Sequence, residues 1–196
     1  MLFQLTYKGI MKGILLSLSI ILAISCSPVV QPTIDSPEIP LARIEAGNKI
    51  ISNQTVAIGT IANARPKISL EDEKKGTITH PDNYANRSVE SALIQALQAR
   101  GVAHTVASQK TIQGEIRNWR SVVHATQSGS IESEATIYVS VINARGQREF
   151  EGVFQGSRSS SFPIVSKNDI KDSLAMAMKQ ALEQLLNDPA FQAVLR

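Results

Sequence analysis

The chain has 196 residues, of which 43% are hydrophobic and 19% are charged, and its formal net charge is +3. This balance is typical of a globular protein and excludes a chain that is disordered throughout. The sequence has no cluster of basic residues with interleaved aromatic residues, so it predicts no nucleic-acid binding.

The first segment in chain order is a short apolar leader that ends at the single cysteine. From Met11 the chain reads MKGILLSLSIILAISC, so a lysine precedes an apolar run whether translation starts at Met1 or at Met11. This pattern is typical of a secretory signal and is too short for a permanent membrane helix, which needs about 20 residues. The sequence therefore predicts a signal peptide over residues 1–25.

The residues before Cys26 carry a second signal. They read LAISC with the cysteine included, and this stretch resembles the lipobox of bacterial lipoproteins. The resemblance implies cleavage between Ser25 and Cys26, a lipid on the Cys26 sulfur and acylation of the new amino terminus. Three acyl chains would anchor the protein in a membrane, because each buried CH₂ contributes about 0.8 kcal/mol. A buried structural cysteine is the alternative interpretation.

The residue after the cysteine bears on the choice of membrane. Ser27 stands where lipoproteins of the inner membrane typically have aspartate, so the same resemblance implies the outer membrane. We expect the protein to face the periplasm, with display on the cell surface as the alternative. Pro28, Pro32, Pro37 and Pro40 follow, and proline at this density favours an extended, semi-rigid chain. We therefore expect a tether over residues 26–53, and a folded domain over residues 54–196.

The first half of this domain alternates between extended and helical patterns. Val56 and Ile58 alternate with smaller residues and predict a strand, whereas residues 63–85 predict a long loop with a short extended piece at Ile78. Residues 86–101 then place apolar side chains at helical spacing. Asn86 or Ser88 is the candidate N-cap of this helix, and Gly101 its expected end.

The second half changes to a period of two. Residues 111–125, 130–144 and 148–157 predict three strands of an antiparallel sheet. In the first of them, Ile112, Ile116 and Val122 share one face. Trp119 lies on the other face, with Tyr138 of the next strand on the same side. Trp119 is therefore either exposed or covered by a loop or partner, and an exposed Trp119 with Tyr138 would form a contact patch for a protein partner.

A long amphipathic pattern follows the strands. Residues 167–187 predict a helix with Ser166 as N-cap and Asp169 at N3, and Asp188 with Pro189 predicts a last short helical turn. The order of elements predicts an α+β fold, a two-layer sandwich in which a mainly antiparallel sheet is covered by two helices.

The sequence offers no recognisable catalytic or metal-binding set. His80, His104 and His124 lack the spacing of zinc ligands, no serine lies in a G-x-S-x-G motif, and EDEKK at 71–75 is typical of a solvated loop. We therefore predict that the protein is not an enzyme and has no cofactor and no metal site.

Several stretches of the chain resemble the YajG-type family of Gram-negative lipoproteins. Besides the lipobox cysteine, they are SALIQALQARGV (91–102), EATIYVSVIN (134–143), REFEGVFQGS (148–157) and ALEQLLNDPAFQAVLR (181–196). The resemblance implies an outer-membrane lipoprotein of α+β fold without known catalysis.

Three hypotheses for function follow. The first is a non-enzymatic interaction or accessory module of the cell envelope that binds an envelope protein. The second is an accessory subunit in the transport or assembly of envelope lipid or lipopolysaccharide. The third is an enzyme acting on the cell wall, which would need polar residues that converge from the 63–85 loop and His104 or His124.

Overall fold

The computed structural model describes residues 50, 55–67, 76–79, 84–124 and 129–196. These residues all belong to the compact unit Ile34–Arg196. The predicted signal peptide, the cleavage site at Ser25 and Cys26, and all of the predicted tether except Ile50 lie outside the described residues. The described structure therefore concerns the predicted domain and, of the predicted tether, Ile50 alone.

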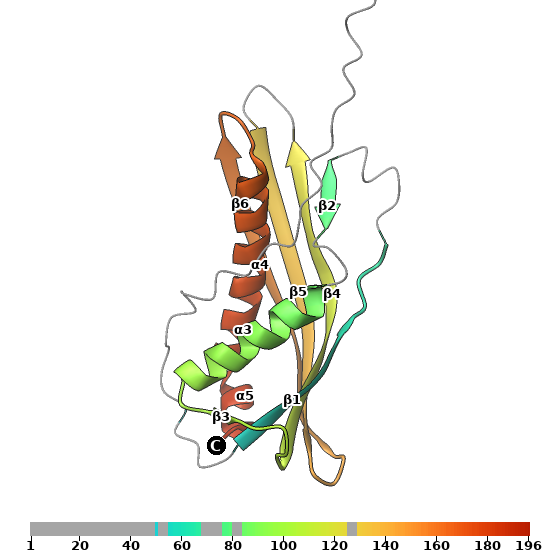
Figure 1. Cartoon of the computed structure of the whole chain (residues 1–196), viewed down its shortest axis with the longest axis vertical. Coiled ribbons are helices and arrows are strands. Elements are labelled where there is room, and N and C mark those ends of the chain that lie inside the picture. The colour runs from blue at the N-terminus through green and yellow to red at the C-terminus, as the bar shows by residue number, and fades with distance from the viewer. Residues whose placement is uncertain (1–49, 51–54, 68–75, 80–83, 125–128) are drawn as a thin grey trace, which may run out of the picture. The chain divides into compact units, whose positions relative to one another are not determined.

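The strands of the described residues form one sheet of six, in the order β3-β1-β4-β5-β6, with β2 beside β4 (Figure 1). The strands β4, β5 and β6 form an antiparallel meander, and β2 is also antiparallel to β4. Their bounds are Thr55–Asn63 for β1, Thr77–Thr79 for β2, Ala103–His104 for β3, Lys110–His124 for β4, Gly129–Asn143 for β5 and Arg148–Phe162 for β6.

Two strands, β1 and the short β2, share one edge of β4. The first part of β4, Lys110 to Ile116, pairs with β1 in parallel, and the later part, Arg120 to Val122, pairs with β2 in antiparallel fashion. Parallel pairing requires a crossover between the two strands, and α3 (Ala85–Ala99) supplies it. The short extended piece predicted at Ile78 is confirmed as β2.

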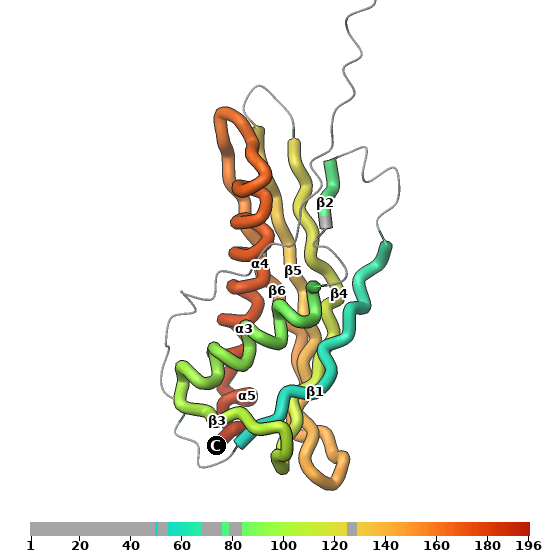
Figure 2. The backbone as a smooth tube through the Cα atoms, viewed as in Figure 1, coloured from blue at the N-terminus to red at the C-terminus, as the bar shows by residue number. Residues whose placement is uncertain are grey.

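Helices cover one face of the sheet. Figures 1 and 2 show α3 running obliquely beside β1, and α4 (Lys167–Asn187) running along β5 and β6, with the short α5 (Pro189–Val194) at its end. The predicted α+β sandwich with a mainly antiparallel sheet is confirmed. The apolar stripes of the helices and the inward side chains of the strands form a single core.

Local capping signals fix the ends of these helices. The Ser166 side chain accepts a hydrogen bond from Asp169 N and the Asp169 carboxylate accepts one from Ser166 N, which confirms the predicted capping box. Asp188 Oδ1 accepts from Phe191 N at the start of α5, as expected. The expected N-cap of α3 was wrong, because that position is Tyr84, which makes no side-chain cap, and Asn86 and Ser88 lie inside the helix.

The end of α3 follows the predicted pattern. Gly101 has φ +89°, a conformation that L side chains rarely adopt. Its N–H bonds to Gln98 O at 3.0 Å and the N–H of Val102 bonds to Leu97 O at 3.0 Å, which together form a Schellman motif. The N–H of Ile50 donates to Arg100 O at 2.8 Å, and Ile50 is buried in the core, so the folded domain includes a residue within the range predicted as tether.

A β-bulge in β4 decides which side chains face the helices. The register with β5 shifts between Ile116 and Asn118, so Arg117 is an extra residue. Ile112 and Ile116 point inward before the bulge, whereas Trp119 points inward after it. The predicted faces of Trp119 and Val122 were therefore wrong. Trp119 was expected on the face opposite Ile116, either exposed or covered by a loop or partner, but it is 1% exposed and lies in the same core as Ile116. Val122, which was expected on the face of Ile116, is only partly buried.

Candidate interaction surface on the open face of the sheet

The face of the sheet that points away from the helices is lined by polar and charged side chains; we call it the open face. Strand alternation and register decide which residues belong to this face, because residues directly opposite each other on paired strands point to the same side of the sheet. Its side chains are Gln113, Glu115, Arg117, Asn118, Arg120, Val122 and His124 of β4, Glu132, Glu134, Thr136 and Tyr138 of β5, and Glu151, Val153 and Gln155 of β6.

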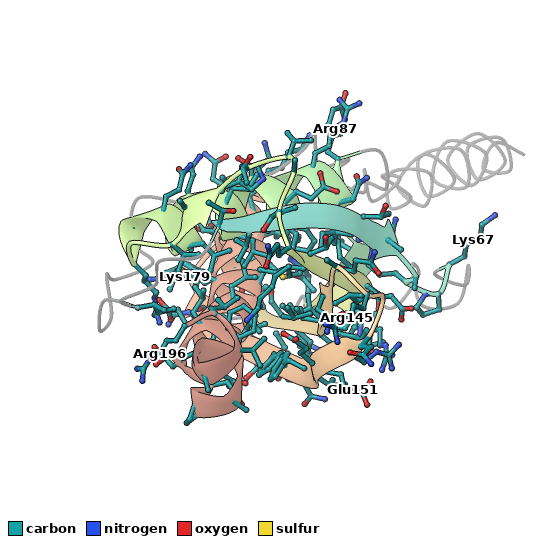
Figure 3. The ribbon with its side chains drawn as sticks, turned by 90° about the horizontal axis from the view of Figure 1, so that it is seen from below. Lys67, Arg87, Arg145, Glu151, Lys179 and Arg196 are labelled. Carbon is teal, nitrogen blue, oxygen red and sulfur yellow. The ribbon has the colours of Figure 1, made fainter. Side chains whose placement is uncertain are left out.

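Tyr138 is the centre of the lower half of this face. The guanidinium of Arg117 lies over its ring, 4.6 Å from the ring centroid, and the Tyr138 hydroxyl donates to Glu151 Oε2 at 2.9 Å. Arg148 Nη1 also binds Glu151 Oε2, at 2.7 Å, and Arg117 Nε binds Glu115 Oε2 at 3.2 Å. The aromatic ring and the charges around it therefore hold each other in place. Figure 3 looks at the domain from below and shows Glu151 beside the strands, with Lys179 on the side of the helices.

The upper half of the open face repeats this charge pairing. Arg120 Nη2 and Asn118 Nδ2 both donate to Glu134 Oε2, at 3.3 and 3.2 Å, and His124 Nε2 lies 3.8 Å from Glu132 Oε2. Exposed ion pairs of this kind each contribute about 0–1 kcal/mol to stability. The pairs therefore matter less for the fold than for the pattern of charge that the face presents.

The open face carries both signs of charge in close alternation. Carboxylates come mainly from β5 and β6 and guanidinium groups mainly from β4, so neither sign dominates. Val153, which is paired with Tyr138 across the strands and is 49% exposed, adds an apolar spot beside the ring. A mixed surface with a central aromatic residue suits a protein partner, because nucleic acids and anionic lipids select for positive charge alone.

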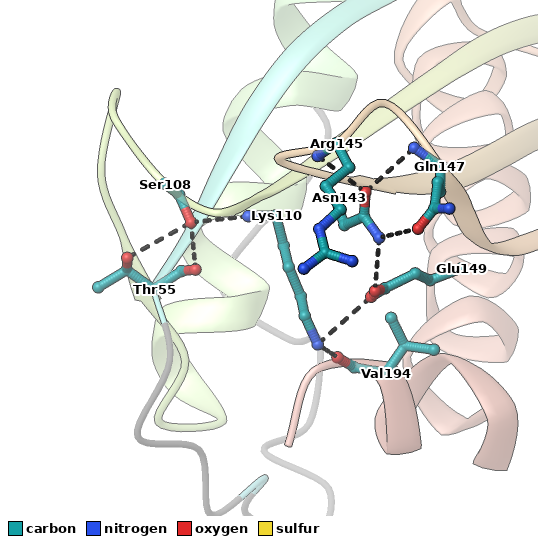
Figure 4. Close-up of polar contacts among 8 residues, drawn as sticks. All are labelled: Thr55, Ser108, Lys110, Asn143, Arg145, Gln147, Glu149 and Val194. Carbon is teal, nitrogen blue, oxygen red and sulfur yellow. Dashed lines mark hydrogen bonds and ion pairs between the residues drawn. The ribbon is translucent and has the colours of Figure 1, made fainter.

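A second polar cluster closes the lower end of the domain (Figure 4). Asn143 Oδ1 accepts from Arg145 N and Gln147 N, both at 3.0 Å, and so shapes the β5–β6 turn. Asn143 Nδ2 also donates to Glu149 Oε1 at 3.0 Å, and Glu149 Oε2 lies 3.5 Å from Lys110 Nζ.

Lys110 extends this cluster to the end of the chain. Its ammonium group donates to the carbonyl of Val194, the last residue of α5. A cation at the carboxyl end of a helix is favourable because the last carbonyl groups carry partial negative charge. The cluster therefore ties the final helix to the sheet.

Arg100 also binds the end of a helix, in this case α4, and it is buried inside the protein. Its side chain is 1% exposed, and its guanidinium donates to Leu186 O and, at 2.9 Å, to Asn187 Oδ1. Burial lowers the pKa of Arg100, and the negative charge of Glu183 opposes that effect. This residue joins the end of α3 to the end of α4 and is structural rather than part of the open face.

Three serine hydroxyls form another buried polar group. Ser121 Oγ and Ser133 Oγ are 2.5 Å apart, and Ser133 Oγ donates to Ser173 Oγ at 2.7 Å. They link β4, β5 and α4 under the helix cover, and the bonds satisfy the hydroxyls. Among the described residues, no group of three or more His, Cys, Asp and Glu side chains could hold a metal ion. In the same part of the chain, no helix has the length and apolar character needed to span a membrane.

Of the two residues in the predicted contact patch, only one lies on the open face. Tyr138 lies on the open face, but Trp119 lies on the opposite side of the sheet, where its indole N–H donates to Leu174 O of α4 at 2.9 Å. Arg117, Glu151 and Arg148 complete the patch around Tyr138 and were not predicted from the sequence. Strand alternation from Tyr138 was the signal that could have found Glu151, since its register partner Ser140 faces the same side as Tyr138.

The fold and the open face define a small α+β domain with one helix-covered side and one charged side. Residues 45–196 match the family model Lipoprotein_16, described as "uncharacterized lipoprotein". The chain therefore belongs to this lipoprotein family, whose description names no catalytic activity. No curated protein matches the chain.

Solved structures are similar to the chain at low sequence identity, and the first of them shares its fold. Protein XCC0632 from Xanthomonas campestris has a TM-score of 0.54 and 11% identity, over 83% of this chain and 94% of that one. Lipoprotein GNA1162 from Neisseria meningitidis has a TM-score of 0.42 and 8% identity, over 69% and 100% of the two chains. A PelC dodecamer from Paraburkholderia phytofirmans has a TM-score of 0.40 and 16% identity, over 70% and 92%.

Proposed function

We propose that this lipoprotein is anchored in the outer membrane by a lipid on Cys26, faces the periplasm and acts as a non-enzymatic interaction module of the cell envelope. Membership of the lipoprotein family and the LAISC sequence before the tether support the anchor. As part of the same proposal, we assign the chain to the YajG-type lipoproteins of Gram-negative bacteria. The anchor keeps the domain near one membrane, so its partner is an envelope component.

The open face is the surface that we assign to this partner. The observation that carries the assignment is the set of contacts around Tyr138, in which Arg117 and Glu151 hold the ring on the side of the sheet that no helix of the described residues covers. Because this face alternates both signs of charge, the partner is an envelope protein with a complementary charged surface rather than a lipid headgroup layer. Side chains that are already ordered lose less entropy on binding.

The anchor is tested by metabolic labelling with palmitate. The wild-type chain should incorporate the label and fractionate with the outer membrane, and Cys26→Ala should abolish the label. Ser27→Asp should move the labelled protein to the inner membrane. Incorporation of label that survives Cys26→Ala would contradict the anchor, and outer-membrane sorting that survives Ser27→Asp would contradict the sorting.

The interaction face is tested by photo-crosslinking in intact cells. A photoreactive residue at Val153 should capture one envelope protein, whereas the same residue at Gln98, on the exposed side of α3, should capture none. Arg117→Glu should then reduce capture at Val153 severalfold, and Arg87→Glu, an exposed charge change on α3, should leave it unchanged. Equal capture from Val153 and Gln98 would contradict the proposal.

A further inference from the structure

The outer edge of β6 is hydrogen-bonded by side chains of α4 instead of by another strand. Among the strands of the described residues, β6 is the last in the sheet, with β5 on one side only. On the other side, the N–H of Ser157 donates to Gln180 Oε1 at 2.8 Å, and the N–H of Gln155 donates to Gln184 Oε1 at 3.4 Å. Two backbone donors that a neighbouring strand would use are therefore occupied by glutamine amides.

The spacing of these contacts matches that of a strand pair. Gln180 and Gln184 are four residues apart on a helix, a rise of about 6 Å, and Gln155 and Ser157 are two residues apart on a strand, a rise of about 6.7 Å. Gln180 binds Ser157 and Gln184 binds Gln155, so the helix and the strand run in opposite directions, as two antiparallel strands do. One side of α4 thus takes the place of an antiparallel strand along this part of the edge.

Gly156 lets the helix come close enough for this. A Cβ at Gly156 would fall on the carbonyl of Ala177 and would lie 2.7 Å from Ala181 N. Glycine on the strand and alanines on the helix bring the two backbones into contact, so the glutamine side chains can reach past β6 to its outer edge. The close approach at Gly156 is therefore what allows Gln180 and Gln184 to bind the edge of β6.

The opposite edge of the sheet shows the same kind of contact. The strand β3 pairs only with Thr55 and Val56 of β1, and further along β1 the N–H of Ile61 donates to Glu90 Oε1 of α3 at 3.4 Å. Both edges therefore have helix side chains as acceptors. An exposed strand edge is a template for pairing with another chain, and covering it suppresses that pairing.

We propose that Gln180 and Gln184 block association of this protein with a second copy of itself through β6. An antiparallel pair of β6 strands centred on Gly156 would use the N–H groups of Gln155 and Ser157, the same two that the glutamines hold. In such a pair, Arg158 of one copy would lie opposite Phe154 of the other, and Glu151 opposite Ser161, so these charged side chains would not face like charges. A second copy is the occupant because the self-complementary edge is present on every molecule.

The test compares two double variants of the full chain, purified in detergent. Gln180→Ala with Gln184→Ala removes both acceptors without weakening the helix, since alanine is the better helix former. Gln180→Glu with Gln184→Glu keeps an acceptor at each position. We measure the mass of the protein by sedimentation across a concentration series, and at the lowest concentration we measure amide hydrogen exchange at Gln155 and Ser157.

The alanine variant should exchange both amides roughly tenfold faster than the wild-type chain and should double in mass as its concentration rises. The wild-type chain and the glutamate variant should remain monomeric. An alanine variant that stays monomeric at every concentration would overturn the proposal, as would a glutamate variant that dimerises as readily. If the alanine variant does not fold, Gln184→Ala alone removes the longer of the two contacts and is subject to the same criteria.

Discussion

The two faces of the sheet hold their aromatic residues by different physical means. Trp119 lies under α4 at 1% exposure, with its indole N–H bonded to the carbonyl of Leu174. Tyr138, on the adjacent strand, lies on the open face between Arg117 and Glu151. The first residue is held by burial, which contributes much stability, and the second by exposed polar contacts, which contribute little. Side chains of the open face can therefore change without loss of the fold.

The strongest test of this difference is the removal of the covered aromatic side chain. Trp119→Ala should lower the free energy of unfolding by about 3–5 kcal/mol, because it leaves a large cavity under α4 and removes the donor to Leu174 O. Urea unfolding followed by circular dichroism measures the loss. Trp119→Phe, which retains most of the ring volume, should lose clearly less. Equal losses for the two variants would mean that packing is not what holds this face.

A buried charge on the covered side should matter next. Arg100→Met keeps an unbranched apolar chain but removes the donors to Leu186 O and Asn187 Oδ1, so we expect a loss of about 1–3 kcal/mol in urea unfolding. The control is Arg87→Met, an exposed arginine of the same helix, which should change stability by less than about 0.5 kcal/mol. A more stable Arg100→Met variant would show that the cost of burying the guanidinium exceeds the benefit of its contacts.

The start of the covering helix should have an intermediate effect. Ser166→Ala removes the side-chain acceptor for Asp169 N, and loss of an N-cap of this kind costs about 1 kcal/mol. Thermal unfolding measures it, and Ser166→Asp, which restores an acceptor, should recover most of the loss. Ser166→Asp as unstable as Ser166→Ala would exclude capping as the cause.

Changes on the open face should affect stability least among the substitutions. Tyr138→Ala removes one exposed hydrogen bond and one cation–π contact, so we expect a loss of about 0.5–1 kcal/mol in urea unfolding. The same substitution should reduce capture of the envelope partner by the probe at Val153. A loss of stability as large as that of Trp119→Ala would remove the distinction between the two faces.

The smallest expected effect concerns pH. Hydrogen bonds from the Ser166 hydroxyl and backbone hold the pKa of Asp169 below its ordinary value of 3.8. Because the folded-state pKa is the lower one, the stabilising contribution is complete above pH 3.8 and is lost as the pH falls through the folded value. Asp169→Ala should therefore be less stable than the wild-type chain at neutral pH, and the difference should shrink in acid unfolding. A difference that is constant down to pH 2 would contradict this.

The helices were predictable because their signals are local. Ser166 with Asp169, Asp188 with Pro189 and the left-handed Gly101 each depend on residues within one helical turn, and the structure confirms them. The failure at Tyr84 has the same origin, since that N-cap has no side-chain signal to read. The candidate site was only half predictable, because strict alternation placed Tyr138 correctly but could not reveal the extra residue Arg117 in β4.

Local patterns were sufficient to predict most of the helices and strands and the α+β class, and they also predict the leader that ends at Cys26. The tertiary structure decided that Trp119 faces α4, that β1 lies parallel to β4, that Arg100 is buried and that two glutamines cover the edge of β6. These features depend on partners that are remote in the chain, 55 residues away for Trp119 and 86 for Arg100. A pattern read over a few residues cannot report such contacts, because their free energy exists only once the segments have come together.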